Sequence, residues 1–193
     1  MYLSKYKADN RMFDEIPTIN LGQFMLRSIY PNNLKLEAKF YYKISCDPLV
    51  KKYLPGAYVE SEEEALIKIE EYVHRTLSGA SVLFCVANSA NKFPFGYILC
   101  SSPIMNYIDS EERIGDWTID FWMHELNRGK GIMTFAVQNA LAHMQSMQIP
   151  KVLAFTDKSN EKSMRLLEKC SMKIIGETSD DKMYKFAVLL NDE

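Results

Sequence analysis

The stretch NRGKGIM, Asn127–Met133, decides how the rest of this sequence is interpreted. It carries two glycines, Gly129 and Gly131, with a basic residue before each of them. The strand-like run DWTIDFWMH precedes it, and the helix-like run IMTFAVQNALAHM overlaps its end. A helix that begins after a glycine turn points its unpaired first amides, which carry the positive end of the helix dipole, at one place. Such a turn predicts either an anion site, with a diphosphate as the usual guest, or a solvated basic turn.

The sequence excludes two well-known phosphate loops at this turn. The P-loop pattern GxxxxGK followed by Ser or Thr is absent. The GxGxxG pattern fails because Thr134 stands at the position of its third glycine. No early strand–helix–strand unit surrounds the turn either, as a dinucleotide-binding fold requires.

Hydrophobic periodicity predicts the elements on both sides of the turn. Before it, we expect strands at residues 21–29, 81–88, 95–102 and 117–124, helices at 34–44 and 62–77, and a loop or short helical piece at 47–55. Ser61 followed by Glu64 is a capping-box pattern at the start of the second helix. After the turn, we expect a helix at 132–144, a strand at 151–157, a helix from Asn160 to about Cys170, and a strand pair at 173–176 and 183–190. This order predicts a mixed sheet with helices on its faces.

Composition favours one soluble globular domain. The chain has 193 residues, a hydrophobic fraction of 47% and a formal charge of -2, so the total charge does not suggest a nucleic-acid partner. No signal peptide or membrane-spanning run is expected, and a cytoplasmic protein is the default. The cysteines are scattered and indicate free thiols, and the histidines lack metal-ligand spacing, so we expect no metal. These residues are Cys46, Cys85, Cys100, Cys170, His74, His124 and His143.

The ordered motifs resemble those of the GNAT superfamily of acetyl-CoA-dependent N-acetyltransferases, and within it the RimJ/RimL branch, which acetylates ribosomal-protein N-termini. Arg128 to Met133 resembles the acetyl-CoA motif of Arg or Gln, two residues, Gly, one residue, then Gly or Ala, with Met133 at the position of the last small residue. Asn160, Ser163 and Lys169 match the branch pattern that follows, whereas Ser171 and Met172 replace its Gly-Phe. The segments DPLVKKYLP and DFWMHELNRGKG also resemble that branch.

The resemblance implies an α+β fold, a single domain over residues 1–193 with a recognisable core at about 21–190. Its centre is a mixed, mostly antiparallel twisted sheet of about seven strands flanked by about four helices. It also implies acetyl-CoA as co-substrate, held in a gap between two splayed strands. The implied cofactor-binding residues are Phe121, Trp122 and Met123 for the pantetheine, Arg128, Gly129, Lys130, Gly131 and Ile132 for the diphosphate, and Asn160 and Ser163 on the far wall.

Proton transfer is less well indicated by the sequence. Strand alternation places Asp120 on the face opposite Phe121, and we expect Asp120 to be the base or an amine-binding carboxylate, or else an exposed or capping acid. His124 is an alternative base, although a solvated histidine is expected at a strand end. The resemblance favours Ser163 as the acid, with Tyr184 second, because the helix tyrosine of many GNAT enzymes is missing here.

The expected function is transfer of an acetyl group from acetyl-CoA to a primary amine by direct attack in a ternary complex. The amine is a protein N-terminal α-amine or a small amine metabolite. The acids of two segments, 60–64 and 109–116, either attract such an amine or are solvated. The alternatives are a non-catalytic acyl-CoA-binding or interaction module, or a fold relic without a cofactor, and a homodimer is left open.

Overall fold

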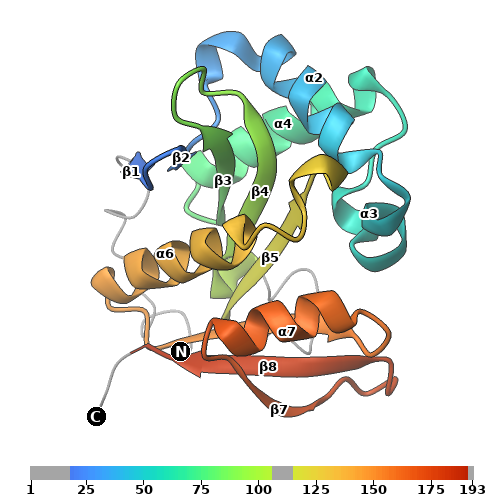
Figure 1. The fold of residues 1–193 in the computed structure, drawn as a ribbon, viewed down its shortest axis with the longest axis vertical. Coiled ribbons are helices and arrows are strands. Elements are labelled where there is room, and N and C mark those ends of the chain that lie inside the picture. Colours follow the sequence, from blue (N-terminus) through green and yellow to red (C-terminus); the bar gives the residue numbers. More distant parts are fainter. Residues whose placement is uncertain (1–17, 106–114, 191–193) are drawn as a thin grey trace.

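The structure is a computed structural model that describes residues 18–105 and 115–190. Its centre is an eight-stranded sheet in the order β1-β2-β3-β4-β5-β6-β8-β7 (Figure 1). Neighbouring strands are antiparallel except β5 and β6, which are parallel. The strands are β1 (Ile19–Asn20), β2 (Phe24–Arg27), β3 (Ser81–Asn88), β4 (Pro94–Ser101), β5 (Trp117–Met123), β6 (Lys151–Asp157), β7 (Lys173–Glu177) and β8 (Met183–Leu189). The predicted mixed, mostly antiparallel sheet is confirmed.

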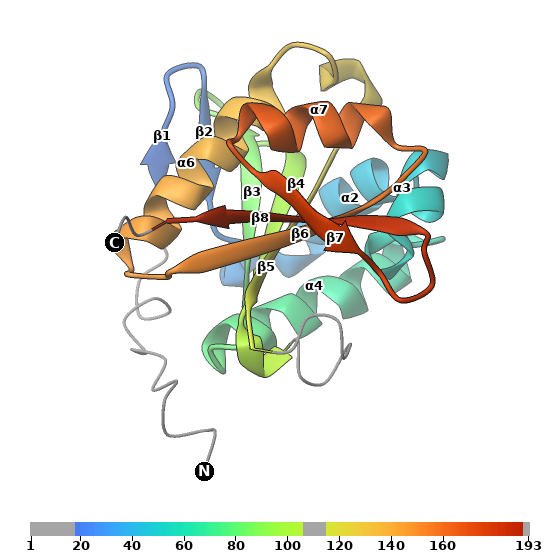
Figure 2. The ribbon, with the colours of Figure 1, turned by 90° about the horizontal axis from the view of Figure 1, so that it is seen from below.

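Helices cover both faces of this sheet. The α-helices described are α2 (Leu34–Ser45), α3 (Pro48–Tyr53), α4 (Glu62–Leu77), α6 (Ile132–Ser146) and α7 (Glu161–Lys169). Figure 2 shows α6 and α7 on one side of the sheet and α4 on the other. The buried side chains accordingly form one cluster between the sheet and α6 and another between the sheet and α2, α3 and α4.

The strand predicted at residues 21–29 is present as the shorter β2, and a second short strand that was not predicted, β1, precedes it. Gly22 has a φ of +81°, in the left-handed region that turns the chain, and the Leu21 amide donates to the Phe24 carbonyl at 2.9 Å. β1 and β2 are therefore the two arms of a tight hairpin, in which Ile19 lies opposite Leu26.

The start of α4 shows how local sequence places a helix. Ser61 Oγ accepts a hydrogen bond from the Glu64 amide at 3.1 Å, as the capping pattern predicts. The Glu64 carboxylate accepts from the Glu60 amide at 2.8 Å, one residue before the cap rather than at the cap itself. The amide and the carboxylate of Glu64 are therefore both engaged in hydrogen bonds at the start of α4.

Candidate active site

The parallel strands β5 and β6 separate after a short contact. They pair at Trp117 with Val152 and at Thr118 with Leu153, and no strand in the part of the chain that the structure describes pairs with the remainder of β5 on that side. The β5 edge toward β6 is therefore open from residue 119 onward, and its backbone groups, apart from the Met123 carbonyl that accepts from Arg128 Nε, are available to a ligand. The predicted gap between splayed strands is confirmed.

Backbone alternation decides which β5 residues face this gap. The His124 amide donates to the Phe95 carbonyl at 2.9 Å, so even-numbered residues direct their backbone groups toward β4. The N–H and C=O groups of Phe121 and Met123 then point toward the gap, whereas those of Trp122 point toward β4. The Trp122 indole is also occupied, since it donates to Ser45 Oγ at 2.8 Å.

The glycine turn ends this gap and begins α6. Gly129 and Gly131 both have a φ of +76°, which favours glycine, and Gly131 is the N-cap of α6 without a side-chain capping bond. A Cβ atom added at either glycine would meet no atom within 4 Å. Among the described residues, none accepts a hydrogen bond from the amides of residues 129–134. The turn therefore presents an open row of backbone donors, as an anion site requires.

Met133 does not obstruct this row of amides. Its side chain is buried and turned toward the sheet, where its Cε lies 3.1 Å from the position of a Cβ on Gly96. Gly96 provides the space on β4 that a larger residue would fill. Met133, which stands at the last position of the Arg128–Met133 motif in place of a small residue, is thus accommodated in the core beneath the turn.

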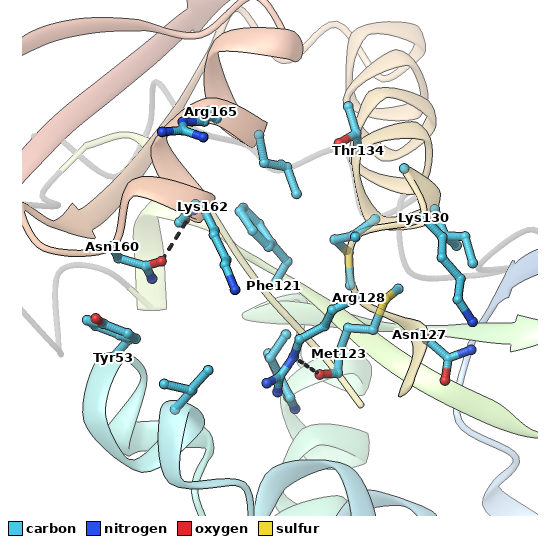
Figure 3. A pocket seen from close by; sticks show the side chains of 18 of the residues that line it. Tyr53, Phe121, Met123, Asn127, Arg128, Lys130, Thr134, Asn160, Lys162 and Arg165 are labelled. Atoms are coloured by element: carbon cyan, nitrogen blue, oxygen red, sulfur yellow. Dashed lines mark hydrogen bonds between the residues drawn. The ribbon is translucent and has the colours of Figure 1, made fainter. Parts of the chain in front are cut away.

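A pocket of about 430 Å³ extends from the gap to the turn (Figure 3). Its walls come from α3, the end of β5, residues 127–134 and the face of α7 that carries Asn160 and Ser163. Among the described residues that line it, none is acidic, whereas the basic ones are Arg128, Lys130, Lys162, Arg165 and Lys169. The donor-rich turn and the excess of positive charge suit an elongated anionic ligand, which fits the acyl-CoA expected from the sequence.

Arg128 is held by protein groups rather than left free for a ligand. Its Nε donates to the Met123 carbonyl at 2.8 Å, and its Nη2 lies 2.7 Å from Asp47 Oδ2. The other oxygen of Asp47 accepts from the Leu49 amide at 2.7 Å and so caps α3. Arg128 therefore joins the glycine turn to α3, the helix that forms the opposite wall of the pocket.

The N-terminus of α7 lies on the far wall of the pocket. Asn160 Oδ1 accepts from the Ser163 amide at 3.3 Å, so Asn160 is the helix cap that the sequence predicts. The helix is attached to α6 at its other end, where Gln138 donates to the Lys169 carbonyl at 2.8 Å. The Cys170 thiol also contacts the Thr134 carbonyl at 3.6 Å. These contacts hold the two helix N-termini at opposite sides of one pocket.

The three predicted proton-transfer residues are not gathered together. Ser163 lines the pocket. Asp120 is on the opposite face of β5, toward α4, where burial, with a smaller contribution from the Asp120 charge, raises the pKa of Tyr72 to about 12. Tyr184 is on β8, opposite Thr156 of β6, with its ring 5.3 Å from Lys158 Nζ. Neither Asp120 nor Tyr184 lines this pocket.

Tyr53 and Lys162 are among the pocket-lining residues that the sequence did not indicate as site residues. Tyr53 on α3 accepts a hydrogen bond from Lys52 Nζ at 2.9 Å, which lowers the pKa of Tyr53, and its hydroxyl lies 3.3 Å from Ser159 Oγ. Lys162, on α7, extends into the pocket (Figure 3). The resemblance of DPLVKKYLP to the RimJ/RimL branch already indicated the segment that forms α3. A lysine in the first turn of a helix, where the helix dipole disfavours a positive charge, is the sequence feature that could have identified Lys162.

The acidic residues expected near an acceptor are partly engaged. Glu60 pairs with Lys51 at 3.0 Å and Asp116 with Lys151 at 2.9 Å. Asp109, Glu111 and Glu112 lie outside the described residues. Within the described ranges, no cluster of His, Cys, Asp or Glu could hold a metal ion. None of the helices described there is long and apolar enough to span a membrane.

Solved structures with the same fold include several acetyltransferases. The ribosomal-protein-S5-alanine acetyltransferase from Vibrio fischeri is 15% identical and superposes with a TM-score of 0.72, over 91% of this chain and 98% of that one. A Salmonella typhimurium acetyltransferase that modifies the N-terminal serine of ribosomal protein L7/L12 is 14% identical, with a TM-score of 0.72 over 91% and 100% of the two chains. The spermidine N-acetyltransferase from Vibrio cholerae, solved with CoA and spermine, is 17% identical, with a TM-score of 0.66 over 87% and 96%.

Sequence similarity to a known protein family, rather than to individual curated proteins, identifies the family of this chain. Comparison with curated proteins found no match. The family described as "Acetyltransferase (GNAT) domain", however, matches residues 26–173, which include the β5 edge, the glycine turn and α7. The fold, the separated strands and this match agree, and the chain belongs to the GNAT acetyltransferase family.

Proposed function

We propose that this protein transfers an acetyl group from acetyl-CoA to a primary amine by direct attack in a ternary complex. The acceptor is a protein N-terminal α-amine or a small amine metabolite. Both acceptor classes are supported by the names of proteins of similar fold, which act on ribosomal proteins and on spermidine.

The observation that carries this proposal is the open β5 edge, which continues into a row of unpaired amides at the start of α6. The Phe121 backbone groups and the Met123 N–H are placed to bond the amides of a pantetheine chain, while the Met123 carbonyl accepts from Arg128. The amides of residues 129–132 are placed to hold its diphosphate. Asn160 and Ser163 complete the far wall.

Bound acetyl-CoA supplies an activated thioester, and the protein has to orient it and move protons. A backbone N–H of β5 that faces the gap can donate to the thioester oxygen as negative charge develops on it. Ser163 and Tyr53 both line the pocket and each carries a hydroxyl, so either is a candidate to protonate the leaving thiolate. Tyr184 is a more distant alternative for this role.

Asp120 is the proposed base or amine-binding carboxylate. It occupies the face of β5 toward α4, opposite the side chains of Phe121 and Met123. An amine that approaches the gap from the α4 side would meet this carboxylate while the acyl donor occupies the other side. Replacement of Asp120 by Asn is then expected to lower kcat/KM for the amine without changing the dissociation constant for CoA.

A thermal unfolding experiment tests the cofactor part of the proposal. Acetyl-CoA and CoA, but not ATP or NAD, should raise the melting temperature. A ligand at 100 times its dissociation constant adds ~2.7 kcal/mol, which at about 2–4 °C per kcal/mol is a rise of roughly 5–11 °C for a domain of this size. The absence of any shift with millimolar acetyl-CoA would contradict the proposal and favour a fold relic. Binding without turnover of any amine would favour an acyl-CoA-binding module.

A further inference from the structure

We infer that Lys162, rather than Arg128 of the glycine motif, is the side-chain cation that contacts the diphosphate of the bound cofactor. The inference rests on the proposed function, since it names a binding residue of the same pocket. Arg128 then acts as a positioning residue that attaches the glycine turn to α3.

The guanidinium of Arg128 has its charge already balanced. Asp47 faces it at 2.7 Å, and the Met123 carbonyl accepts from its Nε at 2.8 Å. Both residues are largely shielded, with 29% of the Arg128 side chain and 15% of the Asp47 side chain exposed. A diphosphate could recruit Arg128 only by breaking a shielded ion pair and uncovering Asp47 beside its own negative charge.

Lys162 is in the opposite situation. It is exposed, and no carboxylate among the described residues lies within ion-pair distance of it. It occupies the first turn of α7, directly after Glu161, where the helix dipole disfavours a positive charge. Figure 3 shows its side chain extending from α7 across the pocket toward Arg128. Lys162 therefore carries an uncompensated positive charge at an unfavourable helix position. Its side chain is directed into a pocket whose described lining has no acidic residue. Both features favour an anionic ligand.

The other pocket cations are less suitable. Figure 3 shows Lys130 extending away from Lys162 and the Arg165 side chain directed away from Arg128. Arg165 is also paired with Glu161 at 2.9 Å, on the same helix. Lys169 lies in the last turn of α7, where the helix dipole already favours a positive charge. Among the described cations of the pocket, Lys162 is the one that combines an unfavourable helix position with the lack of a carboxylate partner.

Calorimetric titration with CoA at about 50 mM and about 300 mM NaCl tests the inference. The proteins are the wild type, K162Q, K162R, R128Q and K173Q. Lys173 is an exposed residue of β7 outside the pocket, so K173Q is a matched control for the loss of one positive charge. We expect K162Q to bind CoA about tenfold more weakly, with a smaller loss of affinity at high salt, and K162R to restore binding. K173Q should bind within about twofold of the wild type.

Two further readouts separate a contact from a structural role. Without ligand, K162Q should melt at the same temperature as the wild type or slightly higher, because a positive charge leaves the start of α7. R128Q should melt at a lower temperature, while its CoA affinity keeps the salt dependence of the wild type. Equal CoA affinity in K162Q and K173Q, or a flattened salt dependence in R128Q alone, would overturn the inference. A wild type that fails to bind CoA contradicts the proposed function itself, which is a different outcome.

Discussion

The carboxylate of Asp47 bonds to the Leu49 amide with one oxygen and to Arg128 Nη2 with the other, each at 2.7 Å. One side chain thus caps α3 and joins it to the glycine turn. On the other side of the pocket, the Tyr53 hydroxyl of α3 meets Ser159 in the turn before α7. The short helix α3 is therefore attached to both walls that hold the cofactor in the proposed function.

Variants at Asp47 can separate its two contacts. D47N keeps a side-chain oxygen that can cap α3 but loses the ion pair, so we expect a loss of about 1 kcal/mol of unfolding free energy. D47A loses both contacts, and the lost cap adds ~1 kcal/mol. Urea denaturation measures the two values. Equal stability of D47N and D47A would show that the capping bond contributes nothing.

Glycine is required in the turn for conformational reasons. An alanine at position 129 or 131 would be held at a φ of +76°, although its Cβ would have open space. We expect G129A and G131A each to lose about 1–2 kcal/mol and to bind CoA more weakly, because the amides shift. G22A in the β1–β2 turn is the control, since Gly22 also has a positive φ and open space. It should lose similar stability with unchanged CoA affinity. Equal CoA affinity in all three variants would contradict the assignment of the turn.

A buried ion pair joins β2 to α2 outside the pocket. Arg27 on β2 and Glu37 on α2 lie 2.9 Å apart, and each side chain is 3% exposed. E37Q leaves a buried guanidinium without its counter-charge, so we expect a loss of about 3–5 kcal/mol. The double variant R27M/E37L should lose less than the sum of the two single losses, because no unpaired charge remains. Additive losses in thermal or urea unfolding would show that the two residues act independently.

Thiol labelling tests the described packing. Cys46 is half-buried, whereas Cys85, Cys100 and Cys170 are buried. Burial raises the pKa of Cys100 to about 12 and that of Cys170 to about 11, so their thiolates are scarce near pH 8. Iodoacetamide should therefore label Cys46 first in the native protein and all four cysteines in urea, as mass spectrometry can show. Rapid native labelling of Cys100 would contradict the packing.

The same thiols predict how stability depends on pH. Their folded-state pKa values lie above the ordinary value of 9.0, so the folded state binds protons more tightly than the unfolded state. The stabilisation is complete below about pH 8 and falls as the pH rises from 9 toward 11 and 12. Unfolding free energy measured over this range should decline, and a rise would contradict the assignment of these thiols as buried.

Local signals made much of the fold predictable. The helix expected at residues 62–77 matches α4, and the strands expected at 81–88 and 151–157 match β3 and β6. Periodicity and capping residues determine these elements over short distances. The strand expected at 21–29 contains β2, but β1 was not predicted, because it is too short to establish a period and the turn that joins it to β2 depends on Gly22.

The site was predictable where a motif lies within one segment. The glycine turn and the Asn160 cap follow from adjacent residues, and both are in the predicted place. The ion pair that engages the Arg128 guanidinium could not be predicted, because its partner Asp47 lies 81 residues earlier in the chain. The direction in which the Trp122 backbone groups point depends on the β4–β5 register, which no local pattern specifies.

Release of free thiol from acetyl-CoA in the presence of amines tests the central claim most directly. The panel should contain peptides with a free N-terminal Ser or Ala, spermidine, and amino-acid-like amines, with N-acetylated peptides as controls. The account predicts amine-dependent thiol release for at least one class, with an acetylated product in the mass spectrum. Tight binding of acetyl-CoA with no amine-dependent release across the panel would contradict it and leave an acyl-CoA-binding module.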